Sequence, residues 1–447
     1  MAAGDRSTDH RRGKSALFLI GCGWAGLAPH WLSESLRLIP ALSLALLLGS
    51  YSLRTVLLQA FRPASPPAAD PPQPPEPLPA VDVVVAARDE QAVIGRLVER
   101  IAQLRYPDGQ LRLWVIDDAS RDRTPQVLAE LQERHPFLQV LRREPDAGGG
   151  KSGALNLVLQ QLQGRWMFVL DADADLQSDT LERLIPYAEA GGWSAVQLRK
   201  AEVNANANWL TRAQAMEMAL DAVIQQGRLA VGGVAELRGN GQLLRRDALL
   251  SSGGFNEATV TDDLDLSFRL LLDGQPIGIL WDPPVQEEAV LSLAALWRQR
   301  QRWAEGGLQR FFDYGPGLLS DRLNGTQKLD LASFFLLQYV LPVVAIADLL
   351  GAVLTRTPPT IWPLSFVAFG LSGGAILAGC RRPGEGPALP AMNPWNLALG
   401  IAYLAHWFVV IPWTSLRMAV LPKTLVWAKT MHLGEDEEAP IEDPATA

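Results

Sequence analysis

The stretch Met167-Phe168-Val169-Leu170-Asp171-Ala172-Asp173 is the part of the chain that decides its fold. Its four apolar residues form a short run typical of a buried strand, and two carboxylates follow where that strand would end. Alternate residues of an extended segment point to one face, so Asp171 and Asp173 can address the same ion. The pattern predicts a buried strand that presents two acidic side chains at its carboxyl end.

The preceding residues repeat this pattern. Asp117 and Asp118 also follow a short apolar run. Strands and helices alternate in this region at the interval of βα units, which predicts a parallel sheet with helices on both faces. In such open α/β sheets, ligands bind outside the carboxyl ends of the strands. The predicted strands are Val81–Ala87 and Leu111–Ile116, and the predicted helices are Gln91–Leu104 and Thr124–Arg134.

Carboxylates gathered at one edge of a sheet repel one another unless a cation neutralises them. Mg²⁺ is commonly bound by one or two carboxylates together with substrate phosphates. We therefore predict a Mg²⁺-dependent site for a nucleotide diphosphate. Asp173 is the expected metal ligand, and Asp171 is expected to contact the metal or the ribose.

A glycine-rich segment, Gly148-Gly149-Gly150-Lys151-Ser152, lies between the two acidic motifs. A full P-loop needs a further glycine five residues before Gly150, and Pro145 stands there, so the segment is no ATPase motif. Flexible glycines let backbone amides approach a diphosphate, and Lys151 adds positive charge. We predict that Lys151 binds the substrate.

Two further motifs follow. Thr261-Asp262-Asp263 supplies another carboxylate pair, and Gln299-Arg300-Gln301-Arg302-Trp303 lies in a segment with helical, amphipathic spacing. Gln299 and Arg302 are three residues apart, which places them on one face of a helix. Arg302 can hold a pyrophosphate there, and Trp303 offers an apolar wall.

Four of these motifs, in their order along the chain, resemble those of the membrane-bound inverting glycosyltransferases of the cellulose and hyaluronan synthase type. They are Asp117-Asp118, Asp171-Ala172-Asp173, Thr261-Asp262-Asp263 and Gln299–Trp303. The resemblance covers roughly residues 80–310 and implies a nucleotide-sugar glycosyltransferase fold of the GT-A type. It also implies that Asp263 is the catalytic base that takes the proton of the acceptor hydroxyl, with Asp262 orienting it. The remaining implied substrate-binding residues are Glu90, Asp117 and Asp118 for uridine, and Gln299, Arg302 and Trp303 for pyrophosphate and acceptor.

Three strings, Gly149–Asn156, Glu236–Gln242 and Arg302–Gly307, resemble more closely the cyanobacterial members of this family that glucosylate diacylglycerol. This resemblance implies a UDP-glucose-dependent hexosyltransferase with diacylglycerol in the bilayer as acceptor. The string Glu236–Gln242, with glycines at 239 and 241, fits a loop near the sugar, where Asn240 or Gln242 could hydrogen-bond the sugar hydroxyls, and a structural turn is the alternative. Two alternatives remain open from the sequence. One is a processive polysaccharide synthase, and the other is a non-catalytic membrane scaffold that senses nucleotide.

Composition supports a membrane-anchored enzyme. The chain has 447 residues, of which 48% are hydrophobic and 20% charged, a mixture that indicates separate polar and apolar blocks. A formal net charge of −8 argues against nucleic-acid binding. We predict a multi-pass membrane protein with a cytoplasmic catalytic domain. The expected parts are a membrane hairpin (1–62), a Pro-rich linker (63–80), the glycosyltransferase domain (81–290), an amphipathic interfacial region (291–325), C-terminal membrane segments (326–425) and an acidic tail (426–447).

The membrane segments leave three questions open. The N-terminal residues can be interpreted as a signal peptide instead of a membrane hairpin. The hairpin is favoured because a second apolar stretch, Leu36–Leu58, directly follows the first, Ser15–Trp31. The apolar stretches Leu331–Leu354, Ile361–Cys380 and Trp395–Val420 do not settle the side on which the chain ends. Asp348 inside the first of them is either a functional group at membrane depth or a residue near the headgroups.

Overall fold

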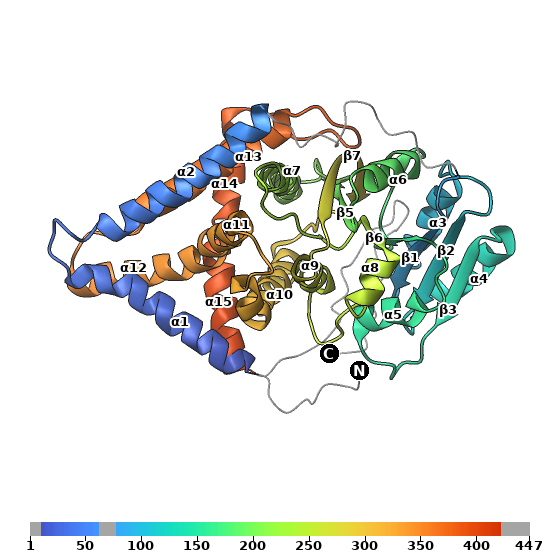
Figure 1. Ribbon diagram of the computed structural model, residues 1–447, viewed down its shortest axis with the longest axis horizontal. Coiled ribbons are helices and arrows are strands. Elements are labelled where there is room, and N and C mark those ends of the chain that lie inside the picture. The colour runs from blue at the N-terminus through green and yellow to red at the C-terminus, as the bar shows by residue number, and fades with distance from the viewer. Residues whose placement is uncertain (1–9, 62–76, 422–447) are drawn as a thin grey trace, which may run out of the picture.

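The computed structural model describes residues 10–61 and 77–421 (Figure 1). The predicted acidic tail and most of the predicted Pro-rich linker lie outside these residues. The chain forms two halves, a mixed sheet covered by helices and a helical half beside it (Figure 1).

A seven-stranded sheet has the order β3-β2-β1-β4-β6-β5-β7. β6 runs antiparallel to β4 and β5, whereas the other neighbouring pairs are parallel. The expected all-parallel sheet is therefore interrupted by one strand, whose four residues are too few to show a periodic pattern. The strands are β1 (Val81–Ala87), β2 (Leu111–Asp117), β3 (Leu138–Arg142), β4 (Trp166–Leu170), β5 (Ala195–Glu202), β6 (Gln242–Arg245) and β7 (Ile277–Glu287).

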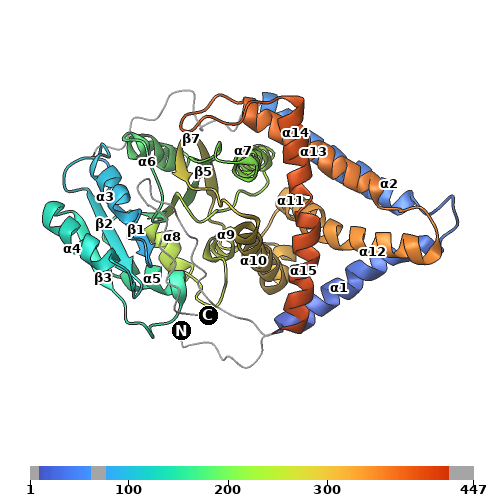
Figure 2. The same cartoon turned by 180° about the vertical axis from the view of Figure 1, so that it is seen from behind.

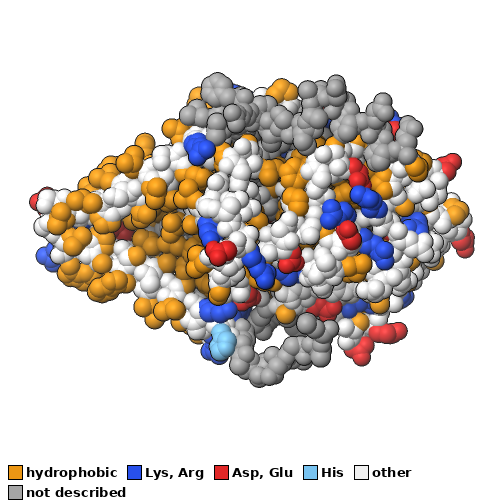
Figure 3. All heavy atoms as spheres, in the orientation of Figure 1, with side chains coloured by type: hydrophobic (Ala, Val, Ile, Leu, Met, Phe, Trp, Pro, Cys, Tyr) orange, Lys and Arg blue, Asp and Glu red, His pale blue; other side chains and the backbone are white. Residues whose placement is uncertain are grey.

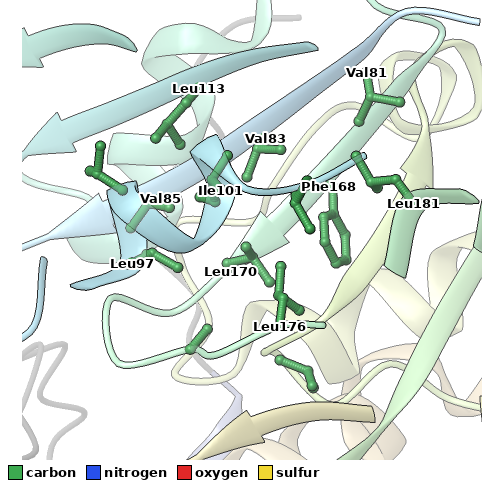
Figure 4. Close-up of a cluster of buried hydrophobic side chains, with 14 of the residues drawn as sticks. Val81, Val83, Val85, Leu97, Ile101, Leu113, Phe168, Leu170, Leu176 and Leu181 are labelled. Atoms are coloured by element: carbon green, nitrogen blue, oxygen red, sulfur yellow. The ribbon is translucent and has the colours of Figure 1, made fainter. Parts of the chain in front are cut away.

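The apolar runs of β1 and β4 are buried because helices cover both faces of the sheet. Val83 and Val85 point into one apolar cluster with Phe168 (Figure 4), and Val84 points into the cluster on the other face. Residues alternate between the faces of a strand, so a central strand needs apolar residues on both faces. The helices of this half are α3 (Ile94–Ala102), α4 (Thr124–Arg134), α5 (Gly150–Leu159), α6 (Thr180–Ala190), α7 (Trp209–Ala230), α8 (Arg246–Ser251) and α9 (Asp262–Leu272).

The helical half is built from both ends of the chain. α1 packs against α12 and α15, and α2 packs against α13 and α7 (Figures 1 and 2). Apolar side chains gather over the surface of this half (Figure 3). Its elements are α1 (Arg11–Leu27), η1 (Ala28–Trp31), α2 (Ile39–Phe61), α10 (Leu293–Leu319), α11 (Gly325–Phe335), the π-helical turn η2 (Leu336–Val340), α12 (Leu341–Thr355), α13 (Trp362–Arg381), α14 (Pro394–Leu404) and α15 (Trp407–Val420).

Among the described residues, three helical segments are long and apolar enough to cross a membrane: Gly325–Thr355, Trp362–Arg381 and Pro394–Val420. They contain the three apolar stretches that the sequence marks near the C-terminus. Asp348 is buried in α12, where it accepts hydrogen bonds from the backbone amides of Thr360 and Ile361 and lies 2.9 Å from His30 Nε2. Its role is to tie α12 and the N-terminal segment to the start of α13.

The centre of α10 differs from the interfacial helix that its Arg and Trp residues suggest. Two of its arginines, Arg300 and Arg310, are enclosed within the molecule and paired with carboxylates of other elements. Arg300 pairs with Glu217 at 2.5 Å, and Arg310 pairs with Glu236 at 3.2 Å. Charged residues at helical spacing thus mark an internal connection between the two halves, because the carboxylates of the sheet half neutralise them.

Candidate functional site

One cavity of about 910 Å³ runs from the carboxyl edge of the sheet into the helical half. It brings together nine of the twelve residues that the sequence nominates. Three others, Asp117, Asp118 and Gln242, do not line it. The nine are Glu90, Lys151, Asp171, Asp173, Asp262, Asp263, Gln299, Arg302 and Trp303.

Lys151 and Asp171 face each other across the sheet edge. The ammonium of Lys151 lies 2.5 Å from Asp171 Oδ1. Burial alone would lower the pKa of Lys151, but the carboxylates of Asp171, Asp262 and Asp263 outweigh it and raise that pKa. Gly149 caps the start of α5 with φ +69°, a conformation that favours glycine and turns the helix N-terminus toward the cavity. The glycine motif therefore supplies a fixed cation beside a helix N-terminus.

Asp173 occupies the wall of the cavity beyond the end of β4. It is buried, and its Oδ2 accepts a hydrogen bond of 3.2 Å from the amide of Glu288. The backbone amide of Asp171, two residues earlier, donates a hydrogen bond of 3.1 Å to Asn240 Oδ1. The two carboxylates thus stand at one edge, as their alternate spacing predicts.

Asp262 and Asp263 begin α9, directly after its N-cap Thr261. Burial and the neighbouring Asp262 raise the pKa of Asp263 to about 6. Asp262 Oδ2 is buried and has no hydrogen-bond partner among the described residues. Gly239, at φ +84°, leaves space beside the Asp263 carboxylate, since a Cβ there would lie 3.5 Å from Oδ2. A carboxylate with such a pKa, next to open space, suits a general base near neutral pH.

The placement of this pair depends on α10. A Cβ added to Gly306 would lie 1.9 Å from Thr261 Oγ1, and one added to Gly307 would lie 2.0 Å from the Tyr339 hydroxyl. Only glycine lets Thr261 pack this closely against the helix. The string Arg302–Gly307 therefore contributes residues that line the cavity, and it also makes the contact that positions Asp262 and Asp263.

The Gln299–Trp303 motif presents its side chains to the cavity from α10. Gln299 accepts a hydrogen bond of 2.7 Å from Arg300, whose guanidinium carbon lies 3.9 Å from the centre of the Trp303 ring. Burial lowers the pKa of Arg302, although the carboxylates of Asp171, Asp263 and Asp262 oppose that shift. Arg302 thus stands among the acidic residues of the site as a cation, and Arg300 holds the motif in place.

Asp117 and Asp118 lie outside the main cavity and take part in ion pairs. Asp117 Oδ1 accepts from the amide of Ser120 at 3.0 Å and so shapes the turn after β2. Asp118 pairs with Arg143, a residue that no sequence motif indicates. Both aspartates stand beside a second cavity of about 470 Å³, lined by Arg88, Ala119, Ser120, Arg121, Arg142, Arg143, Glu144 and Pro145. Arg88 lines both cavities, which places them next to each other.

Gln242 is fully buried in β6, and neither polar atom of its amide has a hydrogen-bond partner among the described residues. The expected contact with the sugar does not fit this position, because β4 and β5 enclose β6 on both sides. Other residues of this string reach the site: Arg238 and Gly239 line the main cavity, and Asn240 accepts the hydrogen bond from the Asp171 amide.

Sequence patterns do not predict three ion pairs at the cavity wall. Lys200 lies 2.7 Å from Glu287, and Arg238 lies 3.0 Å from Asp221 and 2.9 Å from Glu236. Isolated charged residues on strands and helices have no motif of their own, so their partnership appears only in the fold. Far from the sheet, the cavity becomes apolar, with walls from η2, α12, α13 and α15 that include Leu337, Pro342, Ala368, Phe369, Leu371 and Phe408.

An α/β sheet with acidic residues at its carboxyl edge, next to a helical half, is the arrangement that the sequence predicts for a glycosyltransferase of the GT-A type. Residues 79–306 match the family model described as glycosyltransferase-like family 2. The chain belongs to this family.

Two curated relatives are beta-monoglucosyldiacylglycerol synthases. The one from Synechocystis sp. is 43% identical over 97% of this chain and 91% of its own length. The one from Trichormus variabilis is 44% identical over 96% of this chain and 90% of its own length. In structure, the chain resembles a mannosyltransferase from Pyrobaculum calidifontis solved with GDP-Man and Mn²⁺, with a TM-score of 0.55 and 21% identity, covering 84% of this chain and 98% of that one. This last likeness supports the GT-A fold.

Proposed function

We propose that this protein transfers glucose from UDP-glucose to the free hydroxyl of 1,2-diacylglycerol, with inversion, giving beta-monoglucosyldiacylglycerol. The observation that carries the proposal is the single cavity in which Asp263 stands between a diphosphate-binding edge and an apolar chamber. Relatives named for this product, matched over more than nine-tenths of the chain, support the choice of sugar and acceptor.

The nucleotide lies across the two adjoining cavities in this proposal. The uracil occupies the smaller cavity beside Asp117 and Asp118, where a carboxylate oxygen accepts the ring N–H. Glu90 and Arg88 flank the passage to the main cavity. Lys151, at the N-terminus of α5, and Arg302, on α10, then bind the diphosphate from two sides.

A divalent cation, proposed to be Mg²⁺, completes the diphosphate site. Among residues 10–61 and 77–421, no group of three or more His, Cys, Asp and Glu side chains is arranged to hold an ion. Asp173, with Asp171 beside it, would therefore supply only part of the coordination and the phosphates the rest, which fits the preference of Mg²⁺. When bound, the ion offsets the charge that develops on the leaving UDP.

Asp263 performs the proton transfer. Its carboxylate takes the proton from the acceptor hydroxyl while the hydroxyl oxygen forms a bond to C1 of glucose. The bond from C1 to the phosphate oxygen breaks on the opposite face, and UDP leaves with that electron pair. Asp262 keeps the pKa of its neighbour high enough for the exchange, and Lys151 and Arg302 stabilise the leaving phosphate.

The protein is proposed to be a multi-pass membrane protein with its catalytic half in the cytoplasm, where UDP-glucose is available. The three long apolar helices and the apolar surface of the helical half support this arrangement. The acceptor then stays in the bilayer while the nucleotide enters from water.

Incubating the purified protein with labelled UDP-glucose, Mg²⁺ and diacylglycerol tests the proposal. We expect label in a lipid that runs as a monoglucosyl diacylglycerol, and none when diacylglycerol is left out. Label in a high-molecular-weight glycan, formed without added lipid, would support a polysaccharide synthase instead. Binding of UDP without any transfer would support the non-catalytic scaffold.

A further inference from the structure

A buried network of charges lies where the main cavity passes from the sheet edge into the helical half. Arg228 on α7 pairs with Asp330 on α11 at 3.0 Å, and the Tyr51 hydroxyl of α2 donates to the same carboxylate at 3.0 Å. Arg228, Asp330 and Tyr51 all line the cavity. None of them belongs to a motif of the sequence or to the proposed transfer chemistry.

This network connects to the catalytic base along the cavity wall. Arg228 lies 3.6 Å from Glu236, and Glu236 lies 2.9 Å from Arg238. Arg238 precedes Gly239, the residue that packs beside the Asp263 carboxylate. The network is therefore the part of the wall that a molecule extending from Asp263 toward the apolar chamber would meet.

The three arginines of this wall are neutralised. Arg228, Arg238 and Arg310 are matched by Asp330, Asp221 and Glu236, so three positive charges face three negative ones. Such a wall offers no net charge to a phosphate. An uncharged ligand is favoured at this wall, because an anion there would be desolvated while each of the three arginines is already matched by a carboxylate.

Hydrogen-bond donors nevertheless remain. Nη1 of Arg228 is buried and has no hydrogen-bond partner among residues 10–61 and 77–421, while its Nε donates to Asp330. Leaving a buried donor without a partner is energetically unfavourable. A neutral carbonyl oxygen would satisfy this N–H without altering the charge balance.

Beyond the network, the cavity is apolar and open to the side. The face drawn in Figure 3 is hollowed between the α2–α13 pair and α12, and apolar side chains surround the hollow. The π-helical turn η2 contributes Leu337, Gln338 and Tyr339 to the wall here. π-helical turns occur frequently at functional sites, because the extra residue redirects side chains into a cavity.

We propose that Arg228, neutralised by Asp330, donates a hydrogen bond to an ester carbonyl of the acceptor lipid, whose acyl chains occupy the apolar arm. The site thereby selects an uncharged diacyl glycerolipid over a lipid that carries a phosphate. This inference rests on the proposed function and names the residues that recognise its acceptor.

The first test compares a 1,2-diacylglycerol with the ether-linked dialkylglycerol of the same chain length, which lacks the carbonyls. Full-length protein in nanodiscs should use the ester acceptor with a kcat/KM at least fivefold higher. Arg228→Gln should bring this ratio close to one while UDP binding stays within about twofold. If Arg228 has only a structural role, Arg228→Gln should lower the activity on both acceptors by the same factor and leave the ester-to-ether ratio of kcat/KM unchanged. That result would overturn the inference.

Arg228→Lys keeps the charge and its pairing with Asp330 but removes the planar fork of donors. If Arg228→Gln fails to bind UDP, the ester-to-ether ratio of Arg228→Lys decides instead, and an unaltered ratio overturns the inference. A wild-type protein that uses both lipids equally also overturns it. If wild type glucosylates neither lipid, the proposed function itself fails, which is a separate outcome.

The second test concerns charge. Asp330→Asn leaves the wall with three arginines against two carboxylates, so inhibition by phosphatidic acid should strengthen at least tenfold relative to wild type. Asp348→Asn is the matched control, because Asp348 is an equally buried carboxylate of the helical half that does not line the cavity. Equal inhibition of Asp330→Asn and wild type would show that Asp330 does not set the charge preference.

Discussion

At the scale of single residues, the environment of Asp263 decides whether it can act as a base. Replacing Asp263 by Asn removes the proton acceptor but leaves the diphosphate contacts in place. We expect transfer to fall by roughly 10²–10⁴-fold with little change in UDP affinity. Single-turnover transfer and UDP titration measure the two quantities separately. A parallel loss of UDP affinity would assign Asp263 to binding.

The pH dependence follows from the same pKa. A base must be deprotonated to act, so kcat/KM should fall as pH drops below about 6 and level off above it. Asp262→Asn removes the like charge and should lower the pKa of Asp263, which moves the acid limb to lower pH. An acid limb that stays in place in Asp262→Asn would show that another group controls it.

Asp173 is the residue whose loss should mimic removal of the metal. Asp173→Asn deprives the cation of its buried carboxylate, and we expect transfer to be abolished and UDP binding in Mg²⁺ to weaken. In EDTA, wild type and Asp173→Asn should bind UDP with similar affinity. Full activity of the variant, or of wild type in EDTA, would contradict the metal assignment.

At the scale of elements, the contact between α10 and the start of α9 positions the catalytic pair. Gly306→Ala would place a methyl group 1.9 Å from Thr261 Oγ1, so the loop must move. We expect kcat to fall at least tenfold while UDP affinity changes little. Gly315→Ala in the same helix is the control, since its Cβ meets nothing within 4 Å, and both activity and stability should stay close to wild type.

At the scale of the whole molecule, one buried carboxylate joins both ends of the chain to α10. Glu305 pairs with Arg11 of α1 and Arg417 of α15. Glu305→Gln removes the buried charge with which both arginines pair and should lower the free energy of unfolding by about 3–5 kcal/mol. Asp313→Asn breaks the exposed pair with Lys14, also between α10 and α1, and should cost less than about 1 kcal/mol. Thermal unfolding in one detergent compares them, and equal losses would contradict the argument.

The elements that the sequence predicts well are those decided by local patterns. β1 spans Val81–Ala87 and α4 spans Thr124–Arg134, as predicted, because apolar runs and helical periodicity depend on neighbouring residues. β6 is missed because it is short and is held by its neighbours in the sheet. The buried positions of Arg300 and Arg310 on α10 are missed, because arginines at helical spacing are typical of an exposed or interfacial helix. Only the fold shows their carboxylate partners, Glu217 and Glu236.

The sequence by itself determined the chemistry of the sheet edge. Carboxylates that follow apolar strands must meet at one edge of an α/β sheet, so Asp171 and Asp173 could be nominated from order and spacing. Lys151 was nominated from its glycine-rich segment, and Asp263 from the resemblance to a known family. Tertiary structure alone decided which charges neutralise each other. Pairs such as Arg143 with Asp118 and Arg228 with Asp330 join residues with no shared pattern, since electrostatic partnership depends on distance in space and not on separation along the chain.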